Sequence, residues 1–128
     1  MEPKVFHTPN VPKPNAYVPQ AVIAGDFIFI SGTTGVDPVT GKLVEGGLEE
    51  QAIQAFTNIQ TILEDAGSSI NRTVKITVFM VSGADPDFSM INRTYARFFP
   101  ELTPARSAPQ VMPFPGNILV SVECIAAI

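Results

Sequence analysis

Two charged residues near the C-terminal end are candidates for acid–base and anion-binding chemistry. Glu123 is the only charged residue among the 22 that follow Arg106, and it lies inside the apolar segment 119–127. A carboxylate in such a segment loses hydration unless it is paired, hydrogen-bonded or protonated. Arg106 can hold a carboxylate through two parallel hydrogen bonds. That carboxylate could belong to a ligand or to Glu123 itself. The alternatives are a structural salt bridge for Arg106, and a Glu123 that faces solvent or an ion pair between subunits.

Two further positions can contribute to a small-molecule site. Residues 31–35 (SGTTG) end an apolar strand with small side chains, so their backbone N–H groups can approach a ligand. They lack the lysine and the spacing of a phosphate-binding loop, and a plain tight turn is the alternative. Tyr17 follows a proline-rich arm, and its hydroxyl can either reach a pocket or belong to an ordinary packing aromatic.

The number of histidines and cysteines argues against histidine, thiol or metal chemistry. His7 is the only histidine and Cys124 the only cysteine, so we expect no histidine-based triad, no metal site and no internal disulfide. Cys124 adjoins Glu123, and successive strand residues face opposite sides. We therefore expect Cys124 in the core. On pattern alone, Asn92 and Arg93 fall on a solvent or interface side of a helix.

Composition limits the class of protein. The 128 residues fit one domain, residues 1–128, and only 16% are charged while 45% are hydrophobic. A chain this small and this apolar cannot easily bury all its apolar side chains by itself. Burying some of them between subunits is the simplest solution, and we therefore expect a homo-oligomer. The net charge of −4, without any basic run, argues against nucleic acid and anionic membranes as partners. No segment approaches 18 uninterrupted apolar residues, and we expect a cytoplasmic protein.

Hydrophobic periodicity predicts the elements that must position these residues. An extended arm over 1–16 leads to a hairpin of strands 18–24 and 26–31, in which 27–30 are apolar on both faces and should be covered twice. Val74, Ile76, Val78 and Met80 should share one face of the strand 73–81. The other predicted elements are helices 48–66 and 88–99, a left-handed cap at Gly67, an N-cap at 85–87, and strands 105–112 and 118–128. This order predicts an α+β domain with both helices packed on one face of a mixed β-sheet.

Short motifs spread over the whole chain resemble one family. The segment 104–107 (PARS), followed by an apolar strand with VECIA at 122–126, resembles the closing signature of the Rid (YjgF/YER057c/UK114) family of reactive intermediate deaminases. Supporting segments occur in the same order as in that family: YVPQ at 17–20, ISG at 30–32, NI at 58–59, TVF at 77–79 and INRTYARFFP at 91–100.

The resemblance implies a chorismate-mutase-like fold and a homotrimer with three active sites in the clefts between subunits. It implies hydrolysis of enamine and imine acids, such as 2-aminoacrylate and 2-iminobutyrate, to 2-keto acids and ammonia without a cofactor. By this resemblance Arg106 binds the substrate carboxylate and Glu123 activates the attacking water. Tyr17 shapes the pocket and hydrogen-bonds near the reacting nitrogen or water. Three further residues contribute to substrate binding: Ser31, Gly32 and, from the neighbouring subunit, Asn92.

Ala108 occupies a pocket position where family members often have cysteine, so no thiol chemistry is expected there. This and other departures leave the substrate open, and 3-aminoacrylate and 2-aminomuconate remain alternatives. A regulatory trimer that binds a small carboxylate without turnover is a further alternative. A ribonuclease role, attached to some relatives, fits poorly with the negative net charge.

Overall fold

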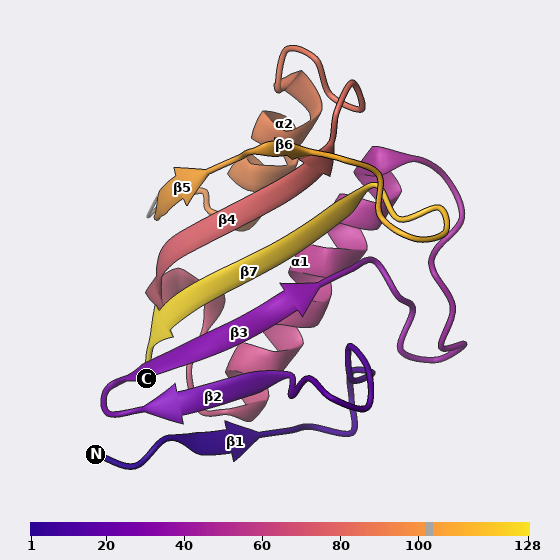
Figure 1. Cartoon of the computed structure of the whole chain (residues 1–128). Helices are drawn as coiled ribbons and strands as arrows, with labels where there is room; N and C mark the ends of the chain where they lie inside the picture. The colour runs from indigo at the N-terminus through magenta and orange to yellow at the C-terminus, as the bar shows by residue number, and fades with distance from the viewer. Residues whose placement is uncertain (102–103) are drawn as a thin grey trace.

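A seven-stranded mixed β-sheet forms one layer of the structure, and two helices form a second layer behind it (Figure 1). This computed structural model describes residues 1–101 and 104–128. The strand order is β1-β2-β3-β7-β4-β5, and β6 also pairs with β4. The α+β class and the placement of both helices on one face are as predicted. The elements are β1 (Lys4–Phe6), β2 (Ala21–Ala24), β3 (Phe27–Thr33), α1 (Leu48–Asp65), a short 3-10 helix (Ile70–Arg72), β4 (Thr73–Val81), α2 (Ser89–Phe98), β5 (Ala105–Ser107), β6 (Gln110–Val111) and β7 (Val120–Ala127).

The N-terminal arm becomes an edge of the sheet. β1 pairs antiparallel with β2, and β2 forms the predicted hairpin with β3 around Gly25 and Asp26. Gly25 has a φ of +59°, a left-handed conformation that glycine adopts without steric cost. Gln20 is 2% exposed and ties the arm to the fold. Its amide accepts the backbone N–H of Thr8 and donates to the carbonyls of Thr8 and Val11.

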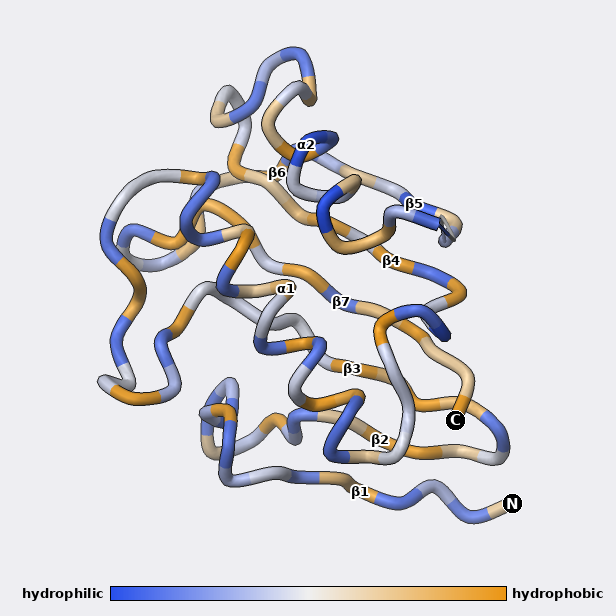
Figure 2. Tube along the Cα trace, turned by 180° about the vertical axis from the view of Figure 1, so that it is seen from behind, coloured by the Kyte–Doolittle hydropathy of each residue, from blue (hydrophilic) through white to orange (hydrophobic). Residues whose placement is uncertain are grey.

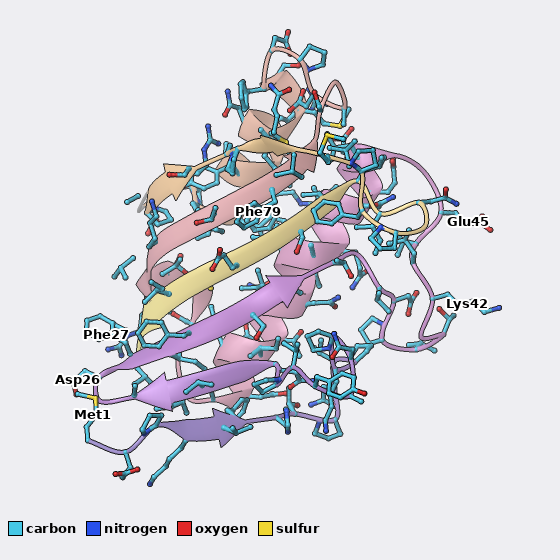
Figure 3. All side chains as sticks on the ribbon, viewed as in Figure 1. Met1, Asp26, Phe27, Lys42, Glu45 and Phe79 are labelled. Atoms are coloured by element: carbon cyan, nitrogen blue, oxygen red, sulfur yellow. The ribbon has the colours of Figure 1, made fainter. Side chains whose placement is uncertain are left out.

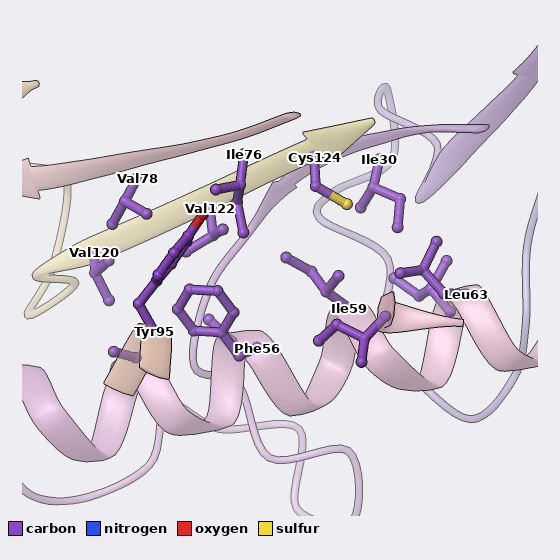
Figure 4. Packing of buried hydrophobic residues seen from close by; sticks show 14 of the residues in the cluster. Ile30, Phe56, Ile59, Leu63, Ile76, Val78, Tyr95, Val120, Val122 and Cys124 are labelled. Carbon is purple, nitrogen blue, oxygen red and sulfur yellow. The ribbon is translucent and has the colours of Figure 1, made fainter. Parts of the chain in front are cut away.

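The predicted amphipathic helix is α1, whose polar and apolar residues alternate along the trace (Figure 2). Its apolar face packs on the sheet, where Phe56, Ile59 and Leu63 meet the inward side chains of the central strands (Figure 4). Phe56 also stacks on Phe98 of α2, with ring centroids 5.2 Å apart. Gly67 just beyond α1 has the predicted left-handed conformation, with φ of +85°.

The start of α2 is held by a buried carboxylate. Asp85 is 5% exposed and accepts the backbone N–H groups of Met90 and Ile91. The predicted N-cap at 85–87 is therefore wrong by one residue, because the N-cap is Phe88 and the helix begins at Ser89, although the Asp85 side chain still binds the first-turn N–H groups. Phe88 at the N-cap has a φ of +61° and is not part of the helix. Asn92 lies four residues after Phe88, in the first turn of α2, so the bonds of Asp85 help to fix its position.

Three details of the predicted strands are wrong. The strand predicted over 105–112 is interrupted at Ala108 and Pro109 and forms two short strands, β5 and β6, which both pair with β4 in the same register. Val74 is 45% exposed, since the pairing of β4 with β7 shifts between Thr73 and Lys75 and turns its side chain outward.

The predicted double cover of β3 is also absent among residues 1–101 and 104–128. Phe27 and Phe29 are 42% and 43% exposed. They lie on the sheet face opposite the helices, which we call the open face; Phe27 and Phe79 are labelled on it in Figure 3. In the described part of the chain no helix is both long and apolar enough to cross a membrane.

Candidate functional site

Glu123 lies on the open face of the sheet. Along β7 the buried residues are Val120, Val122, Cys124 and Ala126, whereas Glu123 is exposed. The strand therefore alternates between the helix layer and the open face, as the period of two requires. The predicted place of Cys124 in the core is confirmed. Burial raises the pKa of the Cys124 thiol to about 12, and the charge of Glu123 adds to the increase.

The strand next to Glu123 contains a β-bulge. Ile30 pairs with Cys124 and Thr33 with Val122, so the two residues between them, Ser31 and Gly32, stand opposite Glu123 alone. A bulge bends the strand and redirects its side chains, and bulges are common beside active sites. The predicted site segment on β3 is therefore adjacent to the predicted carboxylate.

The bulge residues have specific local contacts. The Ser31 hydroxyl donates to the carbonyl oxygen of Pro19 at 2.7 Å, which fixes the segment that follows Tyr17. A side chain at Gly32 would place its Cβ 2.8 Å from Oγ of Ser121. Only glycine fits there without displacing Ser121, so the surface beside Glu123 stays uncovered.

A row of polar positions crosses the open face through Glu123. On the side away from the bulge Glu123 pairs with Thr77 of β4, and Thr77 pairs with Ser107 of β5. Nζ of Lys75 donates to Oγ of Ser107 at 3.2 Å and brings a cation to the end of this row. The alternation of β4 placed Lys75 and Thr77 together, but it could not show that this face is the one that carries Glu123.

The side chain of Arg106 lies on the face of the sheet that is covered by the helices, opposite to Glu123. Arg106 pairs with Ile76, whose side chain is buried under the helices, so both point toward the helix layer. Its guanidinium carbon lies 4.8 Å from the centroid of the Tyr95 ring. Within residues 1–101 and 104–128 no carboxylate lies within 4.0 Å of the Arg106 guanidinium. The ion pair between Arg106 and Glu123, one of the possibilities that the sequence left, is therefore not formed inside the described chain.

The other predicted residues are spread along the chain's surface. Tyr17 is 95% exposed, and its backbone N–H donates to the side chain of Asn15. Asn92 is exposed in the first turn of α2. Ala108 is half-buried and packs against the core between β5 and β6. No hydrogen bond or ion pair among the described residues joins Tyr17 or Asn92 to Arg106 or Glu123. Ala108, in contrast, lies two residues from Arg106 and like it faces the helix layer.

Three hollows of the described chain lie away from Arg106, Glu123 and Tyr17. A cavity of about 150 Å³ between the arm, the end of β3 and α1 includes Gly32 and Asn58 in its lining. Two shallower hollows of about 570 and 440 Å³ are lined by loop 113–119 and by the outer surface of α1. Arg106, Glu123 and Tyr17 line none of these three. In the described ranges no three His, Cys, Asp or Glu side chains cluster closely enough to hold a metal ion.

Comparison with known proteins gives consistent matches over nearly the whole chain. A model of the family described as endoribonuclease L-PSP matches residues 8–128. A Bos taurus protein named 2-iminobutanoate/2-iminopropanoate deaminase is 42% identical over 124 residues, which is 96% of this chain and 88% of that protein. RidA from the Antarctic bacterium Psychrobacter sp. has a similar structure, with a TM-score of 0.90 and 37% identity over 98% of this chain and 99% of that one. E. coli TdcF, solved with bound serine, has a TM-score of 0.87 and 30% identity over 98% of each chain.

Proposed function

Since this chain belongs to the Rid family, whose model is described as endoribonuclease L-PSP, we propose that it hydrolyses reactive imine and enamine acids to 2-keto acids and ammonia. The substrates are 2-aminoacrylate, 2-iminobutyrate and close analogues. The observation that carries the proposal is the exposed carboxylate of Glu123 opposite the Ser31–Gly32 bulge, on a polar row that a small acid can reach. The relative named as a 2-iminobutanoate/2-iminopropanoate deaminase supports the reaction type.

The proposed reaction needs one base and one anion-binding group. An enamine such as 2-aminoacrylate first becomes the imine by gaining a proton on its terminal carbon and losing one from nitrogen. A water oxygen then bonds to the imine carbon while Glu123 accepts a water proton, and the π electrons of the C=N bond move to nitrogen. Glu123 then gives this proton to the nitrogen. Glu123 next takes the proton of the new hydroxyl and passes it to the amine nitrogen. The C–N bond breaks with its electron pair going to nitrogen, the C–O bond becomes the carbonyl, and the products are ammonia and a 2-keto acid. Arg106 holds the substrate carboxylate through paired N–H donors.

The site as proposed requires more than one chain. Ser31 and Ser107 are three strands apart along the polar row, which is about 14 Å at the usual strand spacing. Tyr17 precedes β2, beyond Ser31, while Arg106 lies on β5 and faces the helix layer. One small acid cannot touch both within one chain. We therefore propose a homotrimer with active sites between subunits, in which Asn92 also reaches a neighbour's site.

The open face supports association. It exposes Phe27 and Phe29, and neighbouring Val5 is 64% exposed. Covering these side chains contributes favourable free energy through removal of apolar surface from water. We propose that the protein acts in the cytoplasm on small molecules and needs no cofactor. We also propose that it binds neither nucleic acid nor membranes, because its net charge of −4 repels polyanions.

The test is release of ammonia and keto acid from 2-iminobutyrate and 2-aminoacrylate, produced in situ by a threonine/serine dehydratase. Wild-type protein should accelerate hydrolysis, and Arg106→Ala should lose about 10- to 200-fold in kcat/KM, the effect of a lost charged hydrogen-bonding partner. Arg93→Ala, which removes an exposed arginine paired with Glu49, is the matched control and should keep full activity. A well-folded wild-type assembly without acceleration would reject these two substrates. It would leave 3-aminoacrylate, 2-aminomuconate or a non-catalytic carboxylate binder as the next functions to assay.

A further inference from the structure

Tyr95 of α2 contacts β5 at two separate points. Its hydroxyl donates to the carbonyl oxygen of Pro104 at 2.6 Å, directly before the strand. The face of its ring carries the guanidinium of Arg106, with Cζ 4.8 Å from the ring centroid. The Tyr95 side chain therefore fixes both the backbone at Pro104, just before β5, and the guanidinium of Arg106 within β5.

Stacking on an aromatic face leaves the guanidinium donors free. The five N–H bonds of an arginine lie in the plane of the guanidinium, and an aromatic face offers no carboxylate oxygen to occupy them. In the described part of the chain no carboxylate pairs with Arg106. The ring therefore holds the guanidinium carbon in place, and no acidic side chain of the described residues competes for its N–H groups.

The Tyr95 ring is itself immobilised. It is 7% exposed, and its centroid lies 4.8 Å from that of Phe99 (Figure 4 shows Tyr95 beside Phe56, with its hydroxyl end toward the sheet). Burial raises the pKa of the Tyr95 hydroxyl, while the positive charge of Arg106 acts in the opposite direction. The hydroxyl stays protonated near neutral pH and keeps its hydrogen bond to Pro104.

We propose that Tyr95 is a positioning residue that orients the Arg106 guanidinium for two-point recognition of a ligand carboxylate. The inference rests on the proposed function for the role of Arg106. It adds that the ring of Tyr95, rather than an acidic partner, holds the anion-binding guanidinium in place. An acidic partner would compete with the ligand carboxylate for the same donors, and an aromatic face does not.

The direct test is the affinity for 2-oxobutyrate, the product that carries the carboxylate, measured by calorimetry. Tyr95→Leu removes the ring and should weaken binding by about 2- to 30-fold, the range expected for loss of a cation–π contact. Tyr95→Phe keeps the ring and should remain close to wild type. Phe98→Leu is the matched control, because Phe98 lies on the same helix, stacks on Phe56 and carries another arginine, Arg97, at 5.9 Å. Equal losses in Tyr95→Leu and Phe98→Leu would overturn the proposal.

Two further measurements separate the inference from its premise. In turnover, Tyr95→Leu should raise KM and leave kcat nearly unchanged, and its effect should vanish in an Arg106→Ala background. In wild-type protein, NMR should show side-chain protons of Arg106 shifted upfield by the Tyr95 ring current, relative to Arg93. If 2-oxobutyrate binds but no imine is hydrolysed, the proposed function fails and the Tyr95 effect on affinity is still decided. Absence of both the ring-current shift and the affinity loss would overturn the positioning role.

Discussion

The guanidinium of Arg106 and the carboxylate of Glu123 leave the sheet on opposite faces, with β4 between their strands. Arg106 points toward the helix layer and Glu123 toward the open face. Two groups on opposite faces of one sheet cannot both bind the same small acid inside one chain. The proposed chemistry thus depends on how chains meet, and this dependence can be tested.

Mixing two inactive variants should restore activity. Tyr17 lies before β2 and Arg106 on β5, at opposite ends of the sheet, and the proposed site needs both, so Tyr17→Ala and Arg106→Ala should each be defective alone. Unfolding and reassembling equal amounts of the two should produce intact sites wherever a chain with Tyr17 meets a chain with Arg106, which is about one site in four for a cyclic assembly. Mass spectrometry of differently tagged chains confirms mixing. Mixed assemblies without any recovered activity would show that both residues act within one chain.

Gln20 should determine whether the arm stays docked. Its buried amide satisfies the backbone of Thr8 and Val11, and Gln20→Met keeps the size of the side chain while removing these bonds. Leaving buried backbone groups unpaired should lower the free energy of unfolding by about 1–3 kcal/mol. Limited proteolysis within residues 8–16 should accelerate as well.

Gln60→Met is the control for that experiment, because Gln60 lies half-buried on the outer side of α1. It should leave both the denaturation midpoint and the proteolysis rate close to wild type. Equal behaviour of the two variants would contradict a specific role of Gln20 in holding the arm.

Cys124 should make the protein less stable at alkaline pH. Burial raises the pKa of its thiol to about 12 in the folded state from an ordinary value of 9.0. As the pH rises above 9, the unfolded chain loses this proton while the folded chain keeps it, so the free energy of unfolding falls toward pH 12. In Cys124→Ala this contribution should disappear. Denaturant titrations at pH 8 and pH 10.5 would show it as a smaller pH-dependent loss in the variant, and identical losses would contradict the assignment. Iodoacetamide should modify the folded wild type only slowly at pH 8.

The alternation along β7 made part of the site predictable. Successive strand residues face opposite sides, so Cys124 in the core required Glu123 on the other face. The helix 48–65 and the anchored start of α2 were also predictable, because apolar spacing and capping residues are local signals. The apolar pair Phe27 and Phe29 indicated burial but could not indicate that any cover must come from outside the chain.

Features that depend on two distant segments were not predictable. The bulge opposite Glu123 is a mismatch of register between β3 and β7, and the outward turn of Val74 is another between β4 and β7. Each depends on the partner strand as much as on its own residues. The contact of Tyr95 with Arg106 likewise requires α2 to pack beside β5, which the pattern of neither segment indicates. Pro109 was the one local signal for the break between β5 and β6, because a proline nitrogen cannot donate to a neighbouring strand.

The most direct test of the central claim is Glu123→Gln, a change that keeps the size of the side chain and removes its basicity. The account predicts that kcat for 2-iminobutyrate falls by about 10²- to 10⁴-fold, the usual contribution of a general base. The affinity for 2-oxobutyrate should stay within a few-fold of wild type, since Arg106 still holds the carboxylate. Hydrolysis at the wild-type rate by folded Glu123→Gln would contradict the role of Glu123 and the mechanism built on it.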